Sequence, residues 1–125
     1  MSLEPKEIPD ISSLYMRVHK NHVQENKKVM PIAFRNHEGG MSTDWNEYST
    51  PLETKMRVQL YGKSPDNYGV IKFLVVDIRN IEGQKVIHKP LPENYSHTDV
   101  EGEKIDKIRL LFLRIYKWEI LVDKL

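Results

Sequence analysis

The sequence predicts an α+β domain with a small mixed or antiparallel sheet of four or five strands, packed by a C-terminal helix and one short helix. Three observations lead to this prediction. Several segments alternate between apolar and polar residues, the period of a strand with one buried face. The stretch after Thr50 has the residues of a helix N-terminus. The apolar residues of 103–121 recur at spacings of three and four, the period of a helix.

The first predicted strand covers residues 11–19. Its apolar side chains alternate with polar ones, so one face should be buried while the other carries a polar row. That row consists of Tyr15, Arg17 and His19. Further strands or extended pieces are expected at residues 29–34, 42–45, 69–76, 85–88 and 96–100. Pro31 restricts the piece at 29–34 to a sheet edge or a bulged segment, because proline cannot donate a ladder hydrogen bond.

Thr50 marks the clearest helix start. It is suited to cap a helix, Pro51 to occupy the first helical position, and Glu53 to complete a capping box three residues after the cap. A short helix from 51 to 61 should follow and close at Gly62.

Two further helices are expected. A single turn should cover residues 78–82, capped by Asp77 and stopped by Gly83. Residues 103–121 contain neither glycine nor proline, which favours one long helix that covers the sheet. The alternatives are strand character at 112–116 and a basic amphipathic helix that binds a membrane or a partner.

Composition bounds the class of protein. At 125 residues, with 39% hydrophobic and 30% charged residues, we expect 1–125 to be a single domain with a loose lead-in at 1–10. The chain has no cysteine, which excludes disulfides and thiolate chemistry. The sequence contains no apolar run of membrane-spanning length and no apolar signal-peptide core at its start. We therefore expect a cytoplasmic protein without a membrane partner.

The stretch Arg35–Pro51 is polar but contains large aromatics, which ordinary connectors do not need. We expect Trp45 and Tyr48 to pack inward, with polar neighbours at the rim. Residues 17–35 have a charge balance of +4, and residues 36–54 one of −4. Either the two segments neutralise each other, or a basic rim attracts an anionic ligand.

Candidate site residues come from this stretch and from two other segments. The catalytic candidates are His97, Glu93 and Asp44. His97 follows a rigid proline-containing loop, so its side chain could act as an acid or base or simply hydrogen-bond that loop. The ligand-binding candidates are Arg17, His19, Arg35, Asp44, Trp45 and Asn94, polar groups with aromatic support.

Known cofactor and metal motifs are absent from the sequence. It lacks the phosphate loop, the dinucleotide fingerprint, the zinc-protease helix and the serine-hydrolase elbow. His19 and His22 would chelate a metal only if their loop formed a helical turn, and no carboxylate lies at a helpful offset. We therefore predict no metal and no cofactor. The net charge of +1 gives no general reason to expect nucleic acid.

Five short motifs occur in an order that resembles a family of small prokaryotic proteins. They are Leu14–His19, Ala33–Arg35, Met41–Trp45, Tyr48–Thr54 and Pro90–His97. With the terminal segment that carries Trp118, the likeness covers residues 14–120. It implies a stand-alone domain or a component that acts beside partners, and it brings no assigned activity or catalytic residue.

The opening Leu14-Tyr15-x-Arg17, followed by an aromatic and a Ser-Thr segment at 34–43, is similar to the start of ADP-ribosyltransferase-like toxin domains. In that family an Arg or His on the first strand and a later Glu hold NAD. The resemblance implies Arg17 or His19 in the first role and Glu93 in the second. The chain departs from the family pattern because its Ser-Thr segment runs into Asp44-Trp45 and the paired-glutamate loop is missing.

The leading hypothesis is a non-enzymatic binding module that recognises a protein partner, a second copy of itself, or a small polar or anionic ligand. The alternative is an enzyme that acts on a nucleotide or another phosphate-bearing substrate. In that case Arg17 or Arg35 would hold the anion and His97 would serve as acid or base. Both hypotheses require these side chains to lie together in the folded protein.

Overall fold

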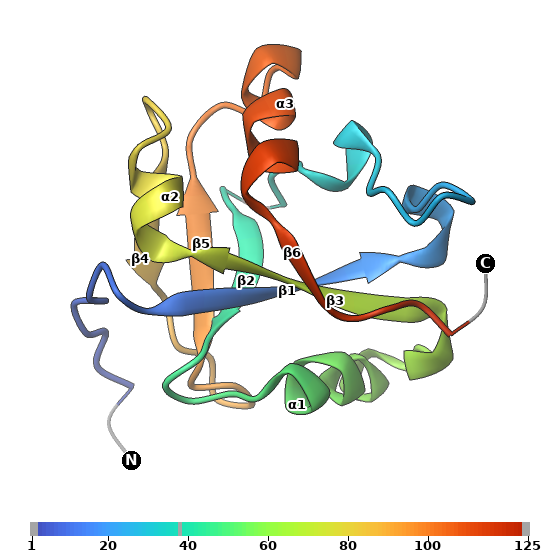
Figure 1. The fold of residues 1–125 in the computed structure, drawn as a ribbon. Helices are drawn as coiled ribbons and strands as arrows, with labels where there is room; N and C mark the ends of the chain where they lie inside the picture. Colours follow the sequence, from blue (N-terminus) through green and yellow to red (C-terminus); the bar gives the residue numbers. More distant parts are fainter. Residues whose placement is uncertain (1–2, 38, 124–125) are drawn as a thin grey trace.

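The computed structural model describes residues 3–37 and 39–123. Its described residues form one antiparallel sheet of six strands, in the order β4-β5-β2-β1-β3-β6, with helices on both sides (Figure 1). The strands are β1 (Ser13–His19), β2 (Met41–Trp45), β3 (Tyr68–Leu74), β4 (Lys85–His88), β5 (His97–Glu101) and β6 (Lys117–Ile120). The α-helices are α1 (Pro51–Met56), α2 (Val75–Arg79) and α3 (Asp106–Ile115). The predicted fold class is confirmed, with six strands rather than four or five.

The hydrophobic core lies on one face of the sheet, under α2 and α3. The apolar side chains of β1 are buried there, while the polar row of the same strand is half-buried on the opposite face. Three aromatic rings from distant segments meet in this core, with centroids 5.5 to 6.1 Å apart: Phe34, Phe73 and Phe112. The alternation predicted for the first strand therefore separates a core face from a polar face.

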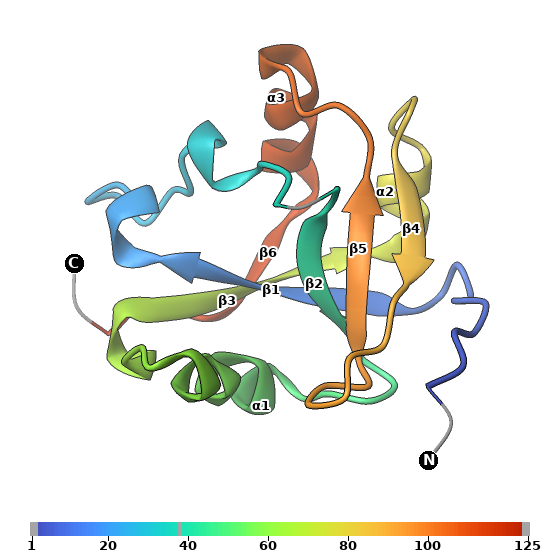
Figure 2. The same ribbon diagram turned by 180° about the vertical axis from the view of Figure 1, so that it is seen from behind.

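The sheet is joined at its centre by very little pairing. β1 pairs with β3 along its whole length, but with β2 only at Leu14–Trp45 and Tyr15–Asp44. Figures 1 and 2 show the result: β1 and β3 lie roughly horizontal in the view, whereas β2, β5 and β4 stand roughly vertical. The two sets of strands diverge beyond the Tyr15–Asp44 pair.

Helix α1 begins as the sequence predicts. The Thr50 hydroxyl accepts a hydrogen bond from the Glu53 amide at 3.1 Å, and the Glu53 carboxylate accepts one from the Thr50 amide at 2.9 Å. After Met56 the chain tightens into a 3-10 helix (Arg57–Tyr61), which ends at Gly62 with a positive φ of 73°. α1 contacts β1 and β3 and lies across them from α3 (Figure 2), so it borders the polar face.

The predicted long C-terminal helix is wrong at both ends. Only Asp106–Ile115 is helical, and Lys117–Ile120 forms the edge strand β6 beside β3. From Tyr116 onward aromatic and apolar residues alternate with charged ones, which suits a half-buried strand. Hydrogen bonds fix this path: the Tyr116 hydroxyl accepts from the Val29 amide, and the Trp118 ring N–H donates to a main-chain carbonyl.

Two other predicted elements differ. The expected strand at 29–34 is instead a 3-10 helix, η2 (Pro31–Ala33), because Pro31 suits a first helical position. The predicted turn at 78–82 starts earlier, since β3 ends at Leu74 and α2 begins at Val75.

The lead-in is anchored rather than loose. Its described part has no helix or strand, but Ile8 is buried and the Lys6 amide donates a hydrogen bond to His88 Nδ1 at 2.9 Å. The Tyr95 hydroxyl donates to the Glu4 carbonyl. Residues 3–10 therefore belong to the folded unit.

Candidate functional site

The polar face contains a concave region that opens where β1 and β2 diverge, and we call it the sheet cleft. It consists of two hollows of about 830 and about 700 Å³. Both hollows are lined by Arg17, Ala33, Arg35, His37, Lys63 and Tyr68. We call the larger hollow, which extends over β2 and β5, the β2–β5 end, and the smaller one the basic end. Both volumes fall within the range of small-molecule sites, about 300 to 1,000 Å³.

Most of the residues proposed from the sequence meet in this cleft. Those that line the β2–β5 end are Arg17, Arg35, Asp44, Asn94 and His97. His19 lines the basic end. Strand register explains the convergence, because β1 and β2 pair Tyr15 with Asp44, and β2 and β5 pair Asp44 with His97. Paired residues and those two positions away lie on the same face of a sheet.

Two proposed residues lie elsewhere. Trp45 is buried on the opposite face, where its ring N–H donates to the Ser12 hydroxyl. Its ring packs against Tyr48 and His88, so its inward packing is confirmed, whereas Tyr48 remains 36% exposed. Glu93 is exposed on the loop before β5 and is not among the lining residues. The NAD-holding pair suggested by the toxin resemblance is thus not brought together around the cleft.

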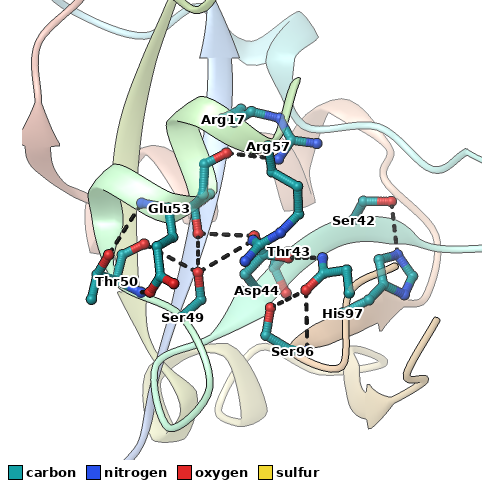
Figure 3. A network of polar contacts seen from close by, with 12 residues as sticks. Arg17, Ser42, Thr43, Asp44, Ser49, Thr50, Glu53, Arg57, Ser96 and His97 are labelled. Atoms are coloured by element: carbon teal, nitrogen blue, oxygen red, sulfur yellow. Dashed lines mark hydrogen bonds and ion pairs between the residues drawn. The ribbon is translucent and has the colours of Figure 1, made fainter. Parts of the chain in front are cut away.

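Asp44 is the centre of a buried polar network (Figure 3). The residue is only 3% exposed. Its Oδ2 accepts hydrogen bonds from Arg57 and from the Thr54 hydroxyl, and its Oδ1 accepts one from the Asn94 amide at 2.8 Å. The carboxylate therefore connects β2 to α1, to the 3-10 helix and to the loop before β5. Its charge is balanced by Arg57, so Asp44 holds the walls of the cleft together.

Arg17 differs from Arg57 in its partners. One of its N–H groups donates to the Thr54 carbonyl at 2.9 Å, which anchors the side chain against α1. Among the described residues, Arg17 has no carboxylate partner. A guanidinium presents five N–H donors in a planar fork, so Arg17 keeps donors available to the cleft that it lines.

The basic end is electropositive. It is lined by three cations and three imidazoles: Arg17, Arg35, Lys63, His19, His22 and His37. None of its described lining residues is a carboxylate. The pKa values of His19 and His22 lie below the usual 6.5. Partial burial is the main cause, and nearby cations lower both pKa values further. Lys20 and Lys63 act on His19, and Arg35 on His22.

The two charge blocks of the sequence do not neutralise each other directly in the part of the chain that is described. No ion pair between those residues joins 17–35 to 36–54, and the partner of Asp44 is Arg57. Direct neutralisation of one block by the other is therefore not seen among these residues, and attraction of an anionic ligand by the basic segment stays a prediction.

His97 lines the β2–β5 end and contacts Lys89, Ser42 and Asp99. Its Nδ1 is 2.9 Å from the Lys89 carbonyl oxygen. Its Nε2 is 3.4 Å from the Ser42 hydroxyl and 3.5 Å from Asp99 Oδ1. Figure 3 shows the Ser42–His97 contact beside the Asp44 network. The arrangement brings together a hydroxyl, an imidazole and a carboxylate on adjacent strands.

Sequence reasoning missed Ser42, Asp99 and Lys63. Ser42 lies two residues before Asp44, and Asp99 two residues after His97, so strand alternation places each on the same face as a residue already proposed. That pattern could have identified both. Lys63 follows the closing Gly62 of a helix, and nothing in its local sequence indicates which surface it faces.

Comparison with known protein families, curated proteins and solved structures finds no match. The resemblances proposed from the sequence therefore remain predictions. Within residues 3–37 and 39–123, no helix has the length and apolar character needed to cross a membrane. The same residues contain no group of three or more His, Asp or Glu side chains arranged to hold a metal ion.

Proposed function

We propose that the protein is a binding module for a small anionic ligand, which it holds at the basic end of the sheet cleft. The observation that carries this proposal is the set of three cations and three imidazoles without a carboxylate among the described lining residues. A phosphate or carboxylate group of the ligand would accept hydrogen bonds from the guanidinium groups of Arg17 and Arg35. Planar guanidinium groups suit such oxyanions because they can donate two parallel bonds.

The shape of the site strengthens the attraction. Cations that line a concave, low-dielectric surface concentrate the local potential more than cations on a convex surface do. Arg17 is held in place by the Thr54 carbonyl, so little of its conformational entropy is lost on binding. The cleft is also large enough for a ligand beyond a bare phosphate, since its two hollows measure about 830 and about 700 Å³ and share six lining residues.

Isothermal titration calorimetry at low salt tests the proposal with inorganic phosphate, pyrophosphate, citrate and nucleoside monophosphates. We expect at least one to bind, and Arg35→Gln to weaken that binding about tenfold or more, since a charge-assisted hydrogen bond contributes about 1.5 to 3 kcal/mol. Arg114→Gln is the matched control, because Arg114 is exposed on α3, away from the cleft. Absence of binding by the whole panel, or equal losses in the two variants, would contradict the proposal.

A pH series with sulfate gives a second, independent measurement. Sulfate does not titrate between pH 5 and 8, whereas the imidazoles of His19 and His22 gain a proton as the pH falls below their pKa, which burial and nearby cations lower from the usual 6.5. A bound dianion favours their charged forms, so its affinity should rise as the pH falls. His22→Asn should flatten this rise. An affinity independent of pH would place the anion away from these imidazoles.

A protein partner is the second candidate, favoured by an exposed apolar row on the outer side of α1 and the 3-10 helix that follows. Leu52, Met56 and Leu60 recur at intervals of four and are 59%, 39% and 60% exposed. Light scattering after size-exclusion chromatography tests whether a second copy covers this row. A dimer that Leu60→Asp converts to monomer would support self-association, and a monomer in the wild type would exclude it.

A further inference from the structure

We propose that Ser42 and His97 act as nucleophile and general base in the hydrolysis of carboxylic esters at the β2–β5 end of the cleft. The preferred substrates would carry a negative charge on the acyl group, a preference that rests on the anion site proposed above. The reactivity of the Ser42–His97 pair does not depend on that site.

Ser42 is placed where a substrate can reach it. It is exposed on β2 and lines the cleft, whereas its strand neighbours Met41 and Thr43 are buried. Its hydroxyl is 3.4 Å from His97 Nε2. This distance is slightly longer than a strong hydrogen bond, and such catalytic contacts commonly shorten only when a substrate is bound.

His97 is oriented as a base toward Ser42. The Lys89 carbonyl oxygen and the Asp99 carboxylate can each only accept a hydrogen bond, and the Lys89 oxygen is the nearer, 2.9 Å from Nδ1 against 3.5 Å from Nε2 to Asp99. This geometry favours the neutral tautomer with its proton on Nδ1, in which Nε2 can accept the proton of the Ser42 hydroxyl. The side chain of His97 is only 17% exposed, which restricts its rotation. A nucleophile beside a base that a third group orients is the arrangement typical of covalent hydrolysis.

Asp99 is a positioning residue for this pair. It lies opposite Ser42 in the sheet, and its Oδ1 is 3.5 Å from His97 Nε2. When Nε2 takes the proton, this carboxylate stabilises the imidazolium. Gly40 packs over Asp99 so closely that an added Cβ would lie 2.7 Å from the Asp99 Cβ. The carboxylate is also paired with Lys89 at 3.6 Å, so its position is fixed from two sides.

The main chain of β2 offers a donor for the developing oxyanion. The Trp45 amide donates to the Ser96 carbonyl, on the β5 side of β2. Amides two residues apart in a strand point to the same edge, so the Ser42 amide points to the opposite edge, toward β1. Pairing between β1 and β2 ends at Tyr15–Asp44, before Ser42 is reached. The Ser42 amide thus points to the edge of β2 where pairing with β1 has ended, and we assign it as the donor to the developing oxyanion.

The reaction is a two-step acyl transfer. Ser42 Oγ attacks the ester carbonyl carbon as Nε2 of His97 takes the hydroxyl proton. The bond from the carbonyl carbon to the alcohol oxygen then breaks, the alcohol leaves with the proton from Nε2, and an acyl-serine remains. Water attacks the acyl carbon while Nε2 takes one of its protons. The bond to Ser42 Oγ breaks, Ser42 regains a proton from Nε2, and the carboxylic acid is released without any oxidation or reduction.

Hydrolysis of two esters measures the activity and its charge preference separately. The probes are 4-nitrophenyl acetate, which is neutral, and mono-4-nitrophenyl succinate, whose acyl group carries a carboxylate. We expect Ser42→Ala to reduce kcat/KM at least a hundredfold for both esters, and His97→Gln to reduce kcat more than it raises KM. Arg35→Gln should lower kcat/KM for the succinate ester more than for the acetate ester, and so remove the preference for succinate.

Covalent labelling distinguishes the pair from an ordinary cross-strand contact. A fluorophosphonate should modify Ser42, as located by peptide mass spectrometry, and the adduct should be lost in His97→Gln although Ser42 is still present. Far-UV circular dichroism checks that each variant is folded. Ser42→Ala is a small change at an exposed position, so it keeps the test valid even if His97→Gln does not fold. An unlabelled Ser42, or equal ester hydrolysis by wild type and Ser42→Ala, would overturn the inference.

The outcomes separate the two proposals. Anion binding in calorimetry with an unreactive Ser42 would leave the binding module and reject the hydrolase. Acyl-serine formation with equal rates for acetate and succinate would keep the nucleophile–base pair and reject the anion preference.

Discussion

Replacing Asp44 with Asn should destabilise the protein by about 3 to 4 kcal/mol, although the two side chains have nearly the same size and shape. Asp44 forms an ion pair with Arg57, whose side chain is only 14% exposed. In the variant, Arg57 would lose its counter-charge. Removing one partner of a buried pair costs about 3 to 5 kcal/mol, because the other charge stays buried without compensation. The new amide would also place a donor among three donors, those of Arg57, Thr54 and Asn94. The free energy of unfolding of a small domain is only about 5 to 15 kcal/mol, so this loss should be easily detected.

Urea denaturation followed by tryptophan fluorescence measures this loss, because Trp45 is adjacent to Asp44 and buried. Glu47→Gln is the control, an exposed acid in the same stretch, expected to change stability by less than about 0.5 kcal/mol. A cycle with Arg57→Met should give an interaction energy of about 2 kcal/mol or more. If Asp44→Asn cost less than about 1 kcal/mol, the structural role assigned to Asp44 would be refuted, and ligand binding would be the better explanation for that carboxylate.

Three further predictions concern the scaffold. Thr50→Ala should lower the free energy of unfolding by about 1 kcal/mol by removing the cap of α1, while Thr50→Ser should not, as urea midpoints will show. Burial lowers the pKa of Lys104 from 10.5 to about 8, so between these values the unfolded chain binds a proton that the folded chain has lost, and stability should rise with pH. Relative to Lys104→Met, the wild type should gain about 1 to 2 kcal/mol between pH 7.5 and 9.5, and parallel curves would disprove this. Gly102→Ala should lower the melting temperature and cost more than about 1 kcal/mol, because φ is +125° and a Cβ would lie 2.3 Å from the Gly83 carbonyl oxygen.

The polar face of the sheet was accessible to sequence reasoning because strand alternation is a local property. Alternation in residues 11–19 placed Arg17 and His19 on one face, and the capping box located α1. Which strands become neighbours depends on contacts between distant segments. The meeting of Asp44 with His97 was therefore a hypothesis until the register was known.

The C-terminal error has a different cause. The spacing of apolar residues in 103–121 is compatible with a helix along its length, and the residues at 116–120 also alternate as in a strand. Local pattern alone does not decide between two compatible periods. The edge of β3 favours the strand. Pairing with β6 satisfies backbone groups at that edge, which a longer helix would leave without ladder partners.

The sparse junction between β1 and β2 also bears on the order in which the chain folds. Only β1–β2 and β4–β5 join strands that are consecutive in sequence, while β1 with β3, β2 with β5 and β3 with β6 connect distant segments. During synthesis, only its two residue pairs with β1 therefore hold β2 in the sheet until β5 has been synthesised. Sheets with such non-local pairing fold slowly, on about the millisecond-to-second scale. The sheet cleft, which lies across that junction, is thus among the last parts of the protein to acquire its shape.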